Sequence, residues 1–348
     1  MRKWMHERGI TAYVVPTADC HCSEYVGAHF QCRAYLTGFT GSAGTAVILK
    51  DRAGLWTDGR YFLQAEEQLK GSGITLYRAG EPGVPTVDEF LAETLQEGEI
   101  LGFDGTCMQS LHGEKLEKLL REKNGSIHCS EDAFEEIWED RPPLSAEKVW
   151  SLPLCYAGES RADKLRRIRE KMAEAGGDHF LLTSLEDIAW LLNLRGNDIR
   201  HCPVFLSFLL MTPAEVRCYL NPAILSEELK TELENDGVRI FPYAAVYEDA
   251  ALLSPEDTMI LDKENVNYLL LTSIPEGVRI LDQQNLTLLP KAIKNPVEIE
   301  NMREAHRKDG VAVIKFLYWL KKNVGTLRIT ELSAADRLLA FRQEQEHF

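Results

Sequence analysis

Two patterns of apolar and polar residues alternate along most of this chain. Short runs of β-branched and other apolar residues, bounded by Gly, Pro or Asp, are typical of buried strands. Between them lie segments in which apolar residues recur every three or four positions, as in amphipathic helices. The alternation continues to about Leu281 and predicts an α/β fold, with sheets covered by helices.

The predicted strands share a short apolar run and a turn signal at one end or both. They are Ile10–Val15, Thr45–Leu49, Leu55–Thr57, Ile74–Arg78, Ile100–Phe103, His179–Leu182, Val204–Met211, Val216–Leu220, Arg239–Pro242, Thr258–Leu261 and Arg279–Leu281. The predicted helices are Met1–Arg8, Tyr61–Lys70, Thr86–Gln96, Gln109–Lys123, Asp132–Trp138, Ser160–Ala175, Leu185–Leu192, Ile224–Asn235 and Val266–Leu271. Residues 17–35 are predicted to be irregular.

The order of these elements repeats. Each half opens with a helix and a strand and continues with strands joined by helices, which predicts two similar α/β domains. Arg141–Gly158, with its prolines and mixed polarity, is the predicted linker. Beyond the second half, Lys294–Asn323 is a clear helix: Asn295 can cap it and Pro296 suits its first turn. Thr330 is predicted to start a second helix.

Composition and charge narrow the class of protein. Lys and Arg number 39 against 54 Asp and Glu, a net charge of −15, which disfavours nucleic acid or an anionic membrane as partner. The N-terminus lacks the apolar core of a signal peptide, and no stretch approaches the 18 or so apolar residues of a membrane span. These features predict a cytoplasmic protein with no nucleic acid or membrane partner.

Cysteine usage fits that compartment. Eight cysteines in a chain of this size without a signal peptide are expected to be reduced thiols. A zinc site can be drawn from five neighbouring residues, but they lack a C-x-x-C pair. These residues are Cys20, His21, Cys22, His29 and Cys32. Buried or free thiols are the preferred interpretation.

The stretch 36–65 contains three glycines spaced by three, Gly38, Gly41 and Gly44, followed by two predicted strands. A phosphate cradle needs a helix N-terminus after its glycines, and a P-loop also needs Lys-Ser/Thr. Neither is present, so the glycines indicate a tightly packed entry to a strand. The second strand ends in Asp58-Gly59-Arg60, which places a carboxylate and a guanidinium at one strand end.

Two sets of polar residues are candidates for contact with a substrate or a partner. Arg60 either makes such a contact or forms an intramolecular pair with Asp58 that fixes the turn, and the pair is the favoured interpretation. Arg195, Asp198 and His201, with Asn197 between them, form the second set. His201 either lines a pocket or is a core histidine bonded to backbone, the latter being favoured.

The sequence resembles a known family in three long stretches. The stretches resemble the Xaa-Pro aminopeptidases. They are SEYVGAHFQCRAYLTGFTGSAGTAVI with LWTDGRYFLQA, then DIAWLLNLRGNDIRHCPVFLSF, and then KNPVEIENMREAHRKDGVAVIKFLYWLKK. These enzymes form the aminopeptidase P branch of the creatinase/prolidase/methionine-aminopeptidase superfamily, peptidase family M24B. The resemblance implies two creatinase N-terminal-type domains with mixed sheets, at 1–157 and 158–290. Residues 291–348 would then begin a pita-bread metallopeptidase domain and leave it incomplete.

The resemblance also implies an activity, which is removal of the N-terminal residue that precedes proline in a peptide. Two bridged divalent ions, usually manganese, activate water in these enzymes. Their ligands, two Asp, one His and two Glu, come from the catalytic domain, and none of those motifs lies in this sequence. We therefore expect no catalytic residue, metal ligand or bound metal in this chain, and no activity of the chain alone. Homodimers are the family's usual state.

Alternatives remain at this stage. The truncation is most simply explained as an expressed fragment, whose two domains would shape substrate access and oligomerisation in the parent enzyme. A naturally short binding or assembly module without catalysis is the second interpretation. A creatinase-like relative with altered chemistry is the third, although the LRG and DGRY motifs favour the aminopeptidase P branch.

Overall fold

A computed structural model describes all residues, 1–348. The chain divides into two compact units, which we describe separately. The first unit joins Met1–Ser151 to Arg161–Leu288, and the second joins Leu152–Ser160 to Leu289–Phe348.

The first unit contains two six-stranded sheets. Their strand orders are β4-β3-β2-β1-β5-β6 and β12-β11-β10-β8-β13-β14, and β7 and β9 pair separately. The strands of the first sheet are β1 (Ala12–Pro16), β2 (Thr45–Leu49), β3 (Ala53–Thr57), β4 (Ile74–Arg78), β5 (Ile100–Phe103) and β6 (Ser126–His128). The remaining strands are β7 (Trp150–Ser151), β8 (His179–Leu182), β9 (Leu194–Arg195), β10 (Phe208–Met211), β11 (Val216–Leu220), β12 (Val238–Pro242), β13 (Thr258–Leu261) and β14 (Arg279–Asp282).

The two sheets have the same topology. In the first, β1–β2 and β2–β3 are antiparallel, whereas β3–β4, β1–β5 and β5–β6 are parallel. In the second, β8–β10 and β10–β11 are antiparallel, whereas β11–β12, β8–β13 and β13–β14 are parallel. This repetition confirms the predicted pair of similar α/β domains, each with a mixed sheet.

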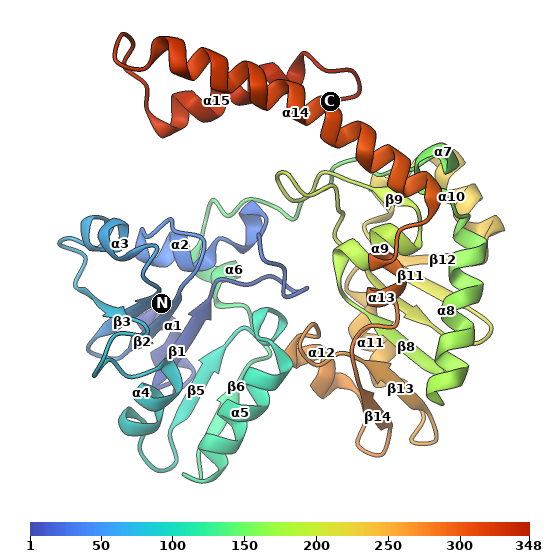
Figure 1. Cartoon of the computed structure of the whole chain (residues 1–348). Helices are drawn as coiled ribbons and strands as arrows, with labels where there is room; N and C mark the ends of the chain where they lie inside the picture. The colour runs from blue at the N-terminus through green and yellow to red at the C-terminus, as the bar shows by residue number, and fades with distance from the viewer. The chain divides into compact units, whose positions relative to one another are not determined.

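Helices flank both sheets (Figure 1). The α-helices of the first unit are α1 (Arg2–Glu7), α2 (Cys32–Thr37), α3 (Phe62–Gln68), α4 (Val87–Thr94), α5 (Ser110–Arg121), α6 (Ala133–Ile137), α8 (Arg161–Ala175), α9 (Leu185–Leu191), α10 (Glu227–Asn235), α11 (Ala245–Ala251), α12 (Tyr268–Ser273) and, at its end, the start of α13 (Leu288–Ala292). On one face of the first sheet, Trp4 of α1 and Phe134 of α6 belong to one apolar cluster. Leu91 of α4 and Leu116 of α5 belong to a second cluster on the other face.

Capping explains several helix starts. Thr86 accepts a hydrogen bond from the Glu89 amide while the Glu89 side chain accepts from the Thr86 amide, which is a capping box at α4. Asn295 and Glu298 make the same exchange at α14 (Pro296–Asn323). Thr330 is the N-cap of α15 (Glu331–Gln343), so the helix begins where it was predicted to start.

Some predicted bounds were wrong, and local hydrogen bonds explain why. The strand predicted from Val204 begins only at Phe208, because Val204 and Leu206 are bonded to Asp198 instead of to the sheet. The helix predicted from Ile224 begins at Glu227, because Ser226 is its cap. The region predicted to be irregular, 17–35, contains the start of α2, a helix that ends at Gly38 with φ +73°.

The second unit is largely a helix pair, accompanied by one short helix and most of α13. Arg342 of α15 donates to Asp309 of α14 at 2.6 Å, and Lys315 pairs with Glu344 at 2.6 Å. Asn301 of α14 donates to the carbonyl of Cys155 in α7 (Leu154–Ala157) at 2.8 Å. Although α14 is 28 residues long, only its Ala312 is buried.

Candidate functional site

The Asp58–Arg60 turn follows β3 directly. Arg60 donates from Nε and Nη2 to the two carboxylate oxygens of Asp58, at 2.9 and 2.8 Å, and its amide donates to Oδ1 at 3.0 Å. These hydrogen bonds hold the pKa of Asp58 at about 2. The structure thus contains the intramolecular pair, while the Arg60 side chain remains 68% exposed and reachable from solvent.

The second set of candidates is divided between interior and surface. Arg195 donates to the carbonyls of Ala189 and Leu194, at 3.0 and 2.7 Å. Asp198 is buried and accepts from the Leu206 amide at 2.7 Å. His201 is exposed with φ +66°, so the interpretation as a core histidine was wrong.

The glycine stretch is built around a buried arginine that sequence reasoning missed. Arg33 donates to the carbonyls of Phe39 and Gly41, and to the hydroxyl of Thr17 at 2.9 Å. A Cβ at Gly41 would lie 2.2 Å from the ring of Phe39. These carbonyls point at a guanidinium, which is the opposite polarity to a phosphate cradle. The stretch is therefore a packed strand entry.

The irregular segment that precedes α2 connects the two α/β domains through a buried histidine. His21 Nδ1 lies 3.0 Å from the carbonyl of Thr183, and Nε2 lies 2.6 Å from the hydroxyl of Tyr243. The side chain of Asn267 donates to the carbonyl of Cys20 at 2.9 Å. Burial is the largest cause of a lowered pKa of His21. These contacts fix the segment against the second domain.

The same segment lies near the second set of candidates. A Cβ at Gly27 would lie 3.6 Å from the carbonyl oxygen of Asp198. The backbone at Gly27 thus lies beside the loop that contains Asp198, a contact that the sequence analysis did not include.

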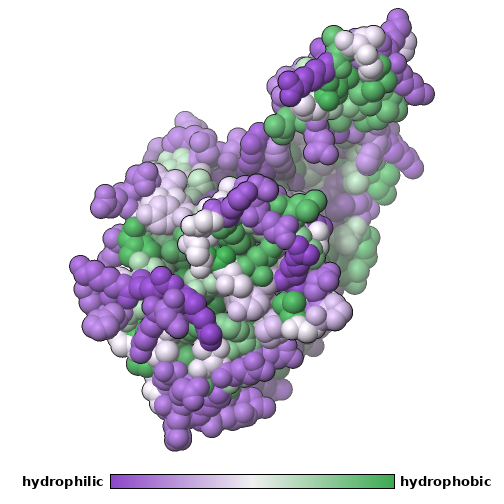
Figure 2. Space-filling view, turned by 90° about the vertical axis from the view of Figure 1, so that its left-hand side faces the viewer, coloured by the Kyte–Doolittle hydropathy of each residue, from purple (hydrophilic) through white to green (hydrophobic).

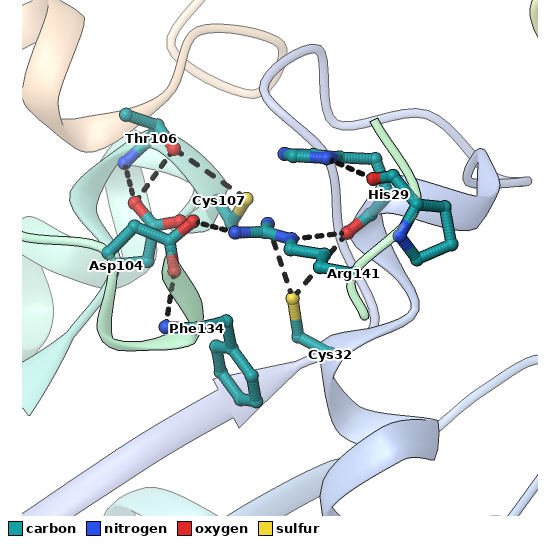
Figure 3. A network of polar contacts seen from close by, with 9 residues as sticks. His29, Cys32, Asp104, Thr106, Cys107, Phe134 and Arg141 are labelled. Atoms are coloured by element: carbon teal, nitrogen blue, oxygen red, sulfur yellow. Dashed lines mark hydrogen bonds and ion pairs between the residues drawn. The ribbon is translucent and has the colours of Figure 1, made fainter. Parts of the chain in front are cut away.

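Arg141, the first residue of the predicted linker, is anchored in the first domain (Figure 3). Its guanidinium donates to Asp132 at 2.5 Å, to the carbonyl of His29 at 3.0 Å and to the thiol of Cys32 at 3.5 Å. The ring of His29 in turn lies 2.8 Å from the carbonyl of Pro142. This end of the linker is thus held firmly to the domain that precedes it.

Asp104 lies beside this network (Figure 3). Its Oδ1 accepts from the amide and the hydroxyl of Thr106, at 2.9 and 2.7 Å. Burial, and then the charge of Asp132, raises the pKa of Asp104 to about 6. Both carboxylates line a cavity of about 340 Å³ together with Glu131, Glu135 and Glu136. The cavity is acidic and its lining includes no histidine.

A larger cavity, of about 540 Å³, opens on the first domain. Its apolar lining includes Leu36, Ala46, Ile48, Ala53 and Ile74. Figure 2 looks at the left-hand side of Figure 1 and shows hydrophobic residues at the surface among hydrophilic ones. The polar lining comprises Arg2, Thr37, Asp51 and Ser72, with no histidine or cysteine.

Comparison with known proteins gives consistent results. Two family models, both described as Creatinase/Prolidase N-terminal domain, match residues 1–136 and 140–298. Aminopeptidase P1 of Lotus japonicus is 35% identical over 99% of this chain, and Aminopeptidase P2 of Arabidopsis thaliana is 35% identical over 98%. A probable Xaa-Pro aminopeptidase P of Sordaria macrospora is 35% identical over the whole chain. The chain covers 61%, 52% and 59% of these three proteins.

A solved structure agrees with the sequence relatives. It is an X-prolyl aminopeptidase from Caenorhabditis elegans, described as a cytosolic enzyme with a di-nuclear active site. The TM-score is 0.91 at 32% identity, over 97% of this chain and 56% of the other. Separately, none of the helices in this structure has the length and apolar composition needed to cross a membrane.

Proposed function

Because the chain belongs to the creatinase/prolidase family, within its aminopeptidase P branch, we propose that it is the N-terminal region of a metal-dependent Xaa-Pro aminopeptidase. The supporting observation is identity of 35% to such enzymes over nearly every residue of the chain. Its substrates are peptides with proline in the second position. The enzyme removes the residue that precedes this proline.

The residues of this chain do not fit a two-ion centre. Two bridged ions need carboxylates that they share, together with further ligands for each ion. The structure brings together one group of three side chains with metal-binding atoms, Asp178, His179 and Asp257. We therefore derive no catalytic step from this chain. In our proposal, two divalent ions, manganese by resemblance, are held in the part of the enzyme that its relatives have and this chain does not cover.

In this proposal the chain shapes substrate access to the catalytic site and mediates oligomerisation, and it supplies no catalytic group. The proposed boundaries are 1–157 and 158–290 for the two creatinase-like domains and 291–348 for the start of the catalytic domain. Arg60 and His201 are the residues proposed to contact substrate or a partner subunit, because both side chains are exposed. Asp58, Arg195 and Asp198 would position them. The proposed enzyme is a cytoplasmic homodimer.

A comparison of two proteins tests this function. One is the chain 1–348, and the other is the protein extended by whatever its source gene encodes beyond Phe348. Both are incubated with Mn²⁺ and either Gly-Pro-Ala or the control peptide Gly-Ala-Ala. We expect the extended protein alone to release glycine, and only from Gly-Pro-Ala, with loss of activity after chelation.

Two other results would contradict the proposal. Cleavage of Gly-Pro-Ala by the chain 1–348 would show that the catalytic groups lie within it. A stop codon after Phe348, or an extended protein that cleaves neither peptide, would favour a non-catalytic binding or assembly module.

A further inference from the structure

Three side chains with metal-binding atoms meet where two neighbouring strands begin in the second sheet. They are Asp178, immediately before β8, His179, its first residue, and Asp257, immediately before β13. One ligand atom from each lies within 4.8 Å of the others. All three residues are partly buried, so the group is reachable from solvent but supported by the domain.

The backbone holds this group in place. Strands β8 and β13 are neighbours in the sheet (Figure 1). They run parallel, with His179 opposite Met259. The Asp178 amide donates to the carbonyl of Thr258 at 3.1 Å, and the Thr258 amide donates to Asp178 Oδ1 at 2.8 Å. The carbonyl of Asp257 accepts from the Arg279 amide at 3.1 Å, which ties β14 to the same place. Ligands on paired strands need little rearrangement to bind an ion.

The hydrogen bonds at the group leave binding capacity. Asp178 Oδ1 accepts from the Thr258 amide and lies 2.8 Å from His179 Nδ1, whereas Asp257 Oδ2 accepts from the Ser254 amide at 2.7 Å. The second oxygen of each carboxylate remains for an ion. In the neutral ring Nδ1 of His179 donates to Asp178 Oδ1, because a carboxylate can only accept. An ion would bind the lone pair of Nδ1 after the ring proton moves to Nε2, and it would replace this hydrogen bond.

We propose that Asp178, His179 and Asp257 bind one zinc ion, with water completing its coordination. Nitrogen from histidine and oxygen from carboxylates are ligands that zinc takes at four-coordinate sites. Calcium and magnesium prefer oxygen ligands alone and more of them, so the imidazole selects against them. The ion would join the starts of β8 and β13 and so stabilise the second domain. This proposal is independent of the two-ion centre discussed above and of peptidase activity.

Titration of the chain 1–348 with ZnCl₂ by isothermal calorimetry tests the proposal. The variants are His179→Ala and Asp257→Asn, the second of which keeps an acceptor for the Ser254 amide. The matched control is His112→Ala, because His112 Nε2 also faces a carboxylate, Asp88, at 2.8 Å, while Lys115 occupies its other oxygen at 2.5 Å. We expect one zinc ion per chain in the wild type and the control, and affinity weaker by roughly tenfold or more in both variants.

Two further measurements separate this site from others. Thermal unfolding should show that zinc raises the melting temperature of the wild type and not that of His179→Ala, whose circular dichroism spectrum shows whether it is folded. Titration with Co²⁺ should give no thiolate charge-transfer band, because such a band would assign binding to cysteines. Equal zinc affinity in the wild type, His179→Ala and Asp257→Asn would overturn the proposal, as would equal affinity for Ca²⁺.

Discussion

The hydroxyl of Tyr243 donates a hydrogen bond to Nε2 of His21 across 2.6 Å, and the other ring nitrogen fixes this direction. Nδ1 faces the carbonyl of Thr183 at 3.0 Å, and a carbonyl can only accept, so Nδ1 carries the proton. Burial, which is only partly opposed by the charges of Asp19 and Asp198, lowers the pKa of the ring, so the neutral form is the one present at pH 7. A neutral, fully bonded imidazole therefore joins the two α/β domains.

The first prediction is that acid weakens this junction. The folded-state pKa of His21 lies below the ordinary value of 6.5, so the unfolded chain binds more protons as the pH falls through that value. The contribution of His21 to stability is present above about pH 6.5 and is lost as the pH drops towards the folded-state pKa. Urea unfolding between pH 7.5 and 5 should show this decline.

Substitution of the ring tests the assignment. His21→Asn keeps a donor for the Thr183 carbonyl but leaves the Tyr243 hydroxyl without its acceptor, which should cost about 1–3 kcal/mol at pH 7.5. The difference from the wild type should shrink as the pH falls, because the variant has no ring to protonate. A difference that stays constant from pH 7.5 to 5 would contradict the lowered pKa.

Asp104 gives a pH dependence of opposite sign. Its folded-state pKa, about 6, lies above the ordinary 3.8, so the folded chain binds more protons between these values. Stability from this group is greatest below about pH 4 and is lost as the pH rises towards 6. Asp104→Asn keeps an acceptor for both hydrogen bonds from Thr106 and should be more stable than the wild type by about 1–2 kcal/mol at pH 7.5. Urea unfolding at pH 7.5 and pH 4 checks this, with equal stability expected at the lower pH.

The exposed pair of Arg60 and Asp58 should matter for activity and not for stability. Exposed ion pairs contribute little to folding because water screens them, so Arg60→Ala and Asp58→Asn should leave the urea midpoint unchanged. If Arg60 contacts substrate or a partner subunit, Arg60→Ala should raise KM or weaken the dimer in the extended protein. Asp58→Asn, which keeps the guanidinium, should have the smaller effect. Equal activity of Arg60→Ala and the wild type would assign the arginine to the turn alone.

Several strands could be predicted from the sequence to the residue. Strands with the predicted bounds include Thr45–Leu49, Ile74–Arg78, Ile100–Phe103, His179–Leu182 and Thr258–Leu261. Each is a short apolar run with a turn signal close by, so the information that defines it is local. The cap at Asn295 and the helix start at Thr330 were predicted for the same reason, since the capping residue directly precedes its helix.

Contacts between distant residues could not be predicted in this way. His21 and Tyr243 are 222 positions apart, and nothing in the surrounding pattern marks either as buried and paired. Val204 lies in an apolar run but is bonded to the Asp198 loop, a choice set by tertiary structure. For His201 the local pattern was misleading, because the following Pro203 and apolar residues indicated an interior that its own side chain does not enter.

The last prediction compares two glycines that lie inside helices. Alanine is the better helix former by about 1 kcal/mol, so packing decides the sign of a glycine-to-alanine change. A Cβ at Gly113 in α5 would lie 2.2 Å from the ring of Tyr268, which is buried at the start of α12 in the second domain. At Gly310 in α14 nothing lies within 4 Å of the same position.

Gly113→Ala should therefore destabilise the chain by about 1–3 kcal/mol, because the backbone of α5 packs directly on this ring and cannot yield without separating the helices. Gly310→Ala should stabilise its helix by about 0.5–1 kcal/mol. Urea unfolding of both variants checks the signs. Gly113→Ala should cost less stability when it is made in the Tyr268→Leu variant than when it is made in the wild type, since the smaller side chain removes the clash. A loss of the same size in both backgrounds would show that Gly113 is needed for a reason other than the contact with Tyr268.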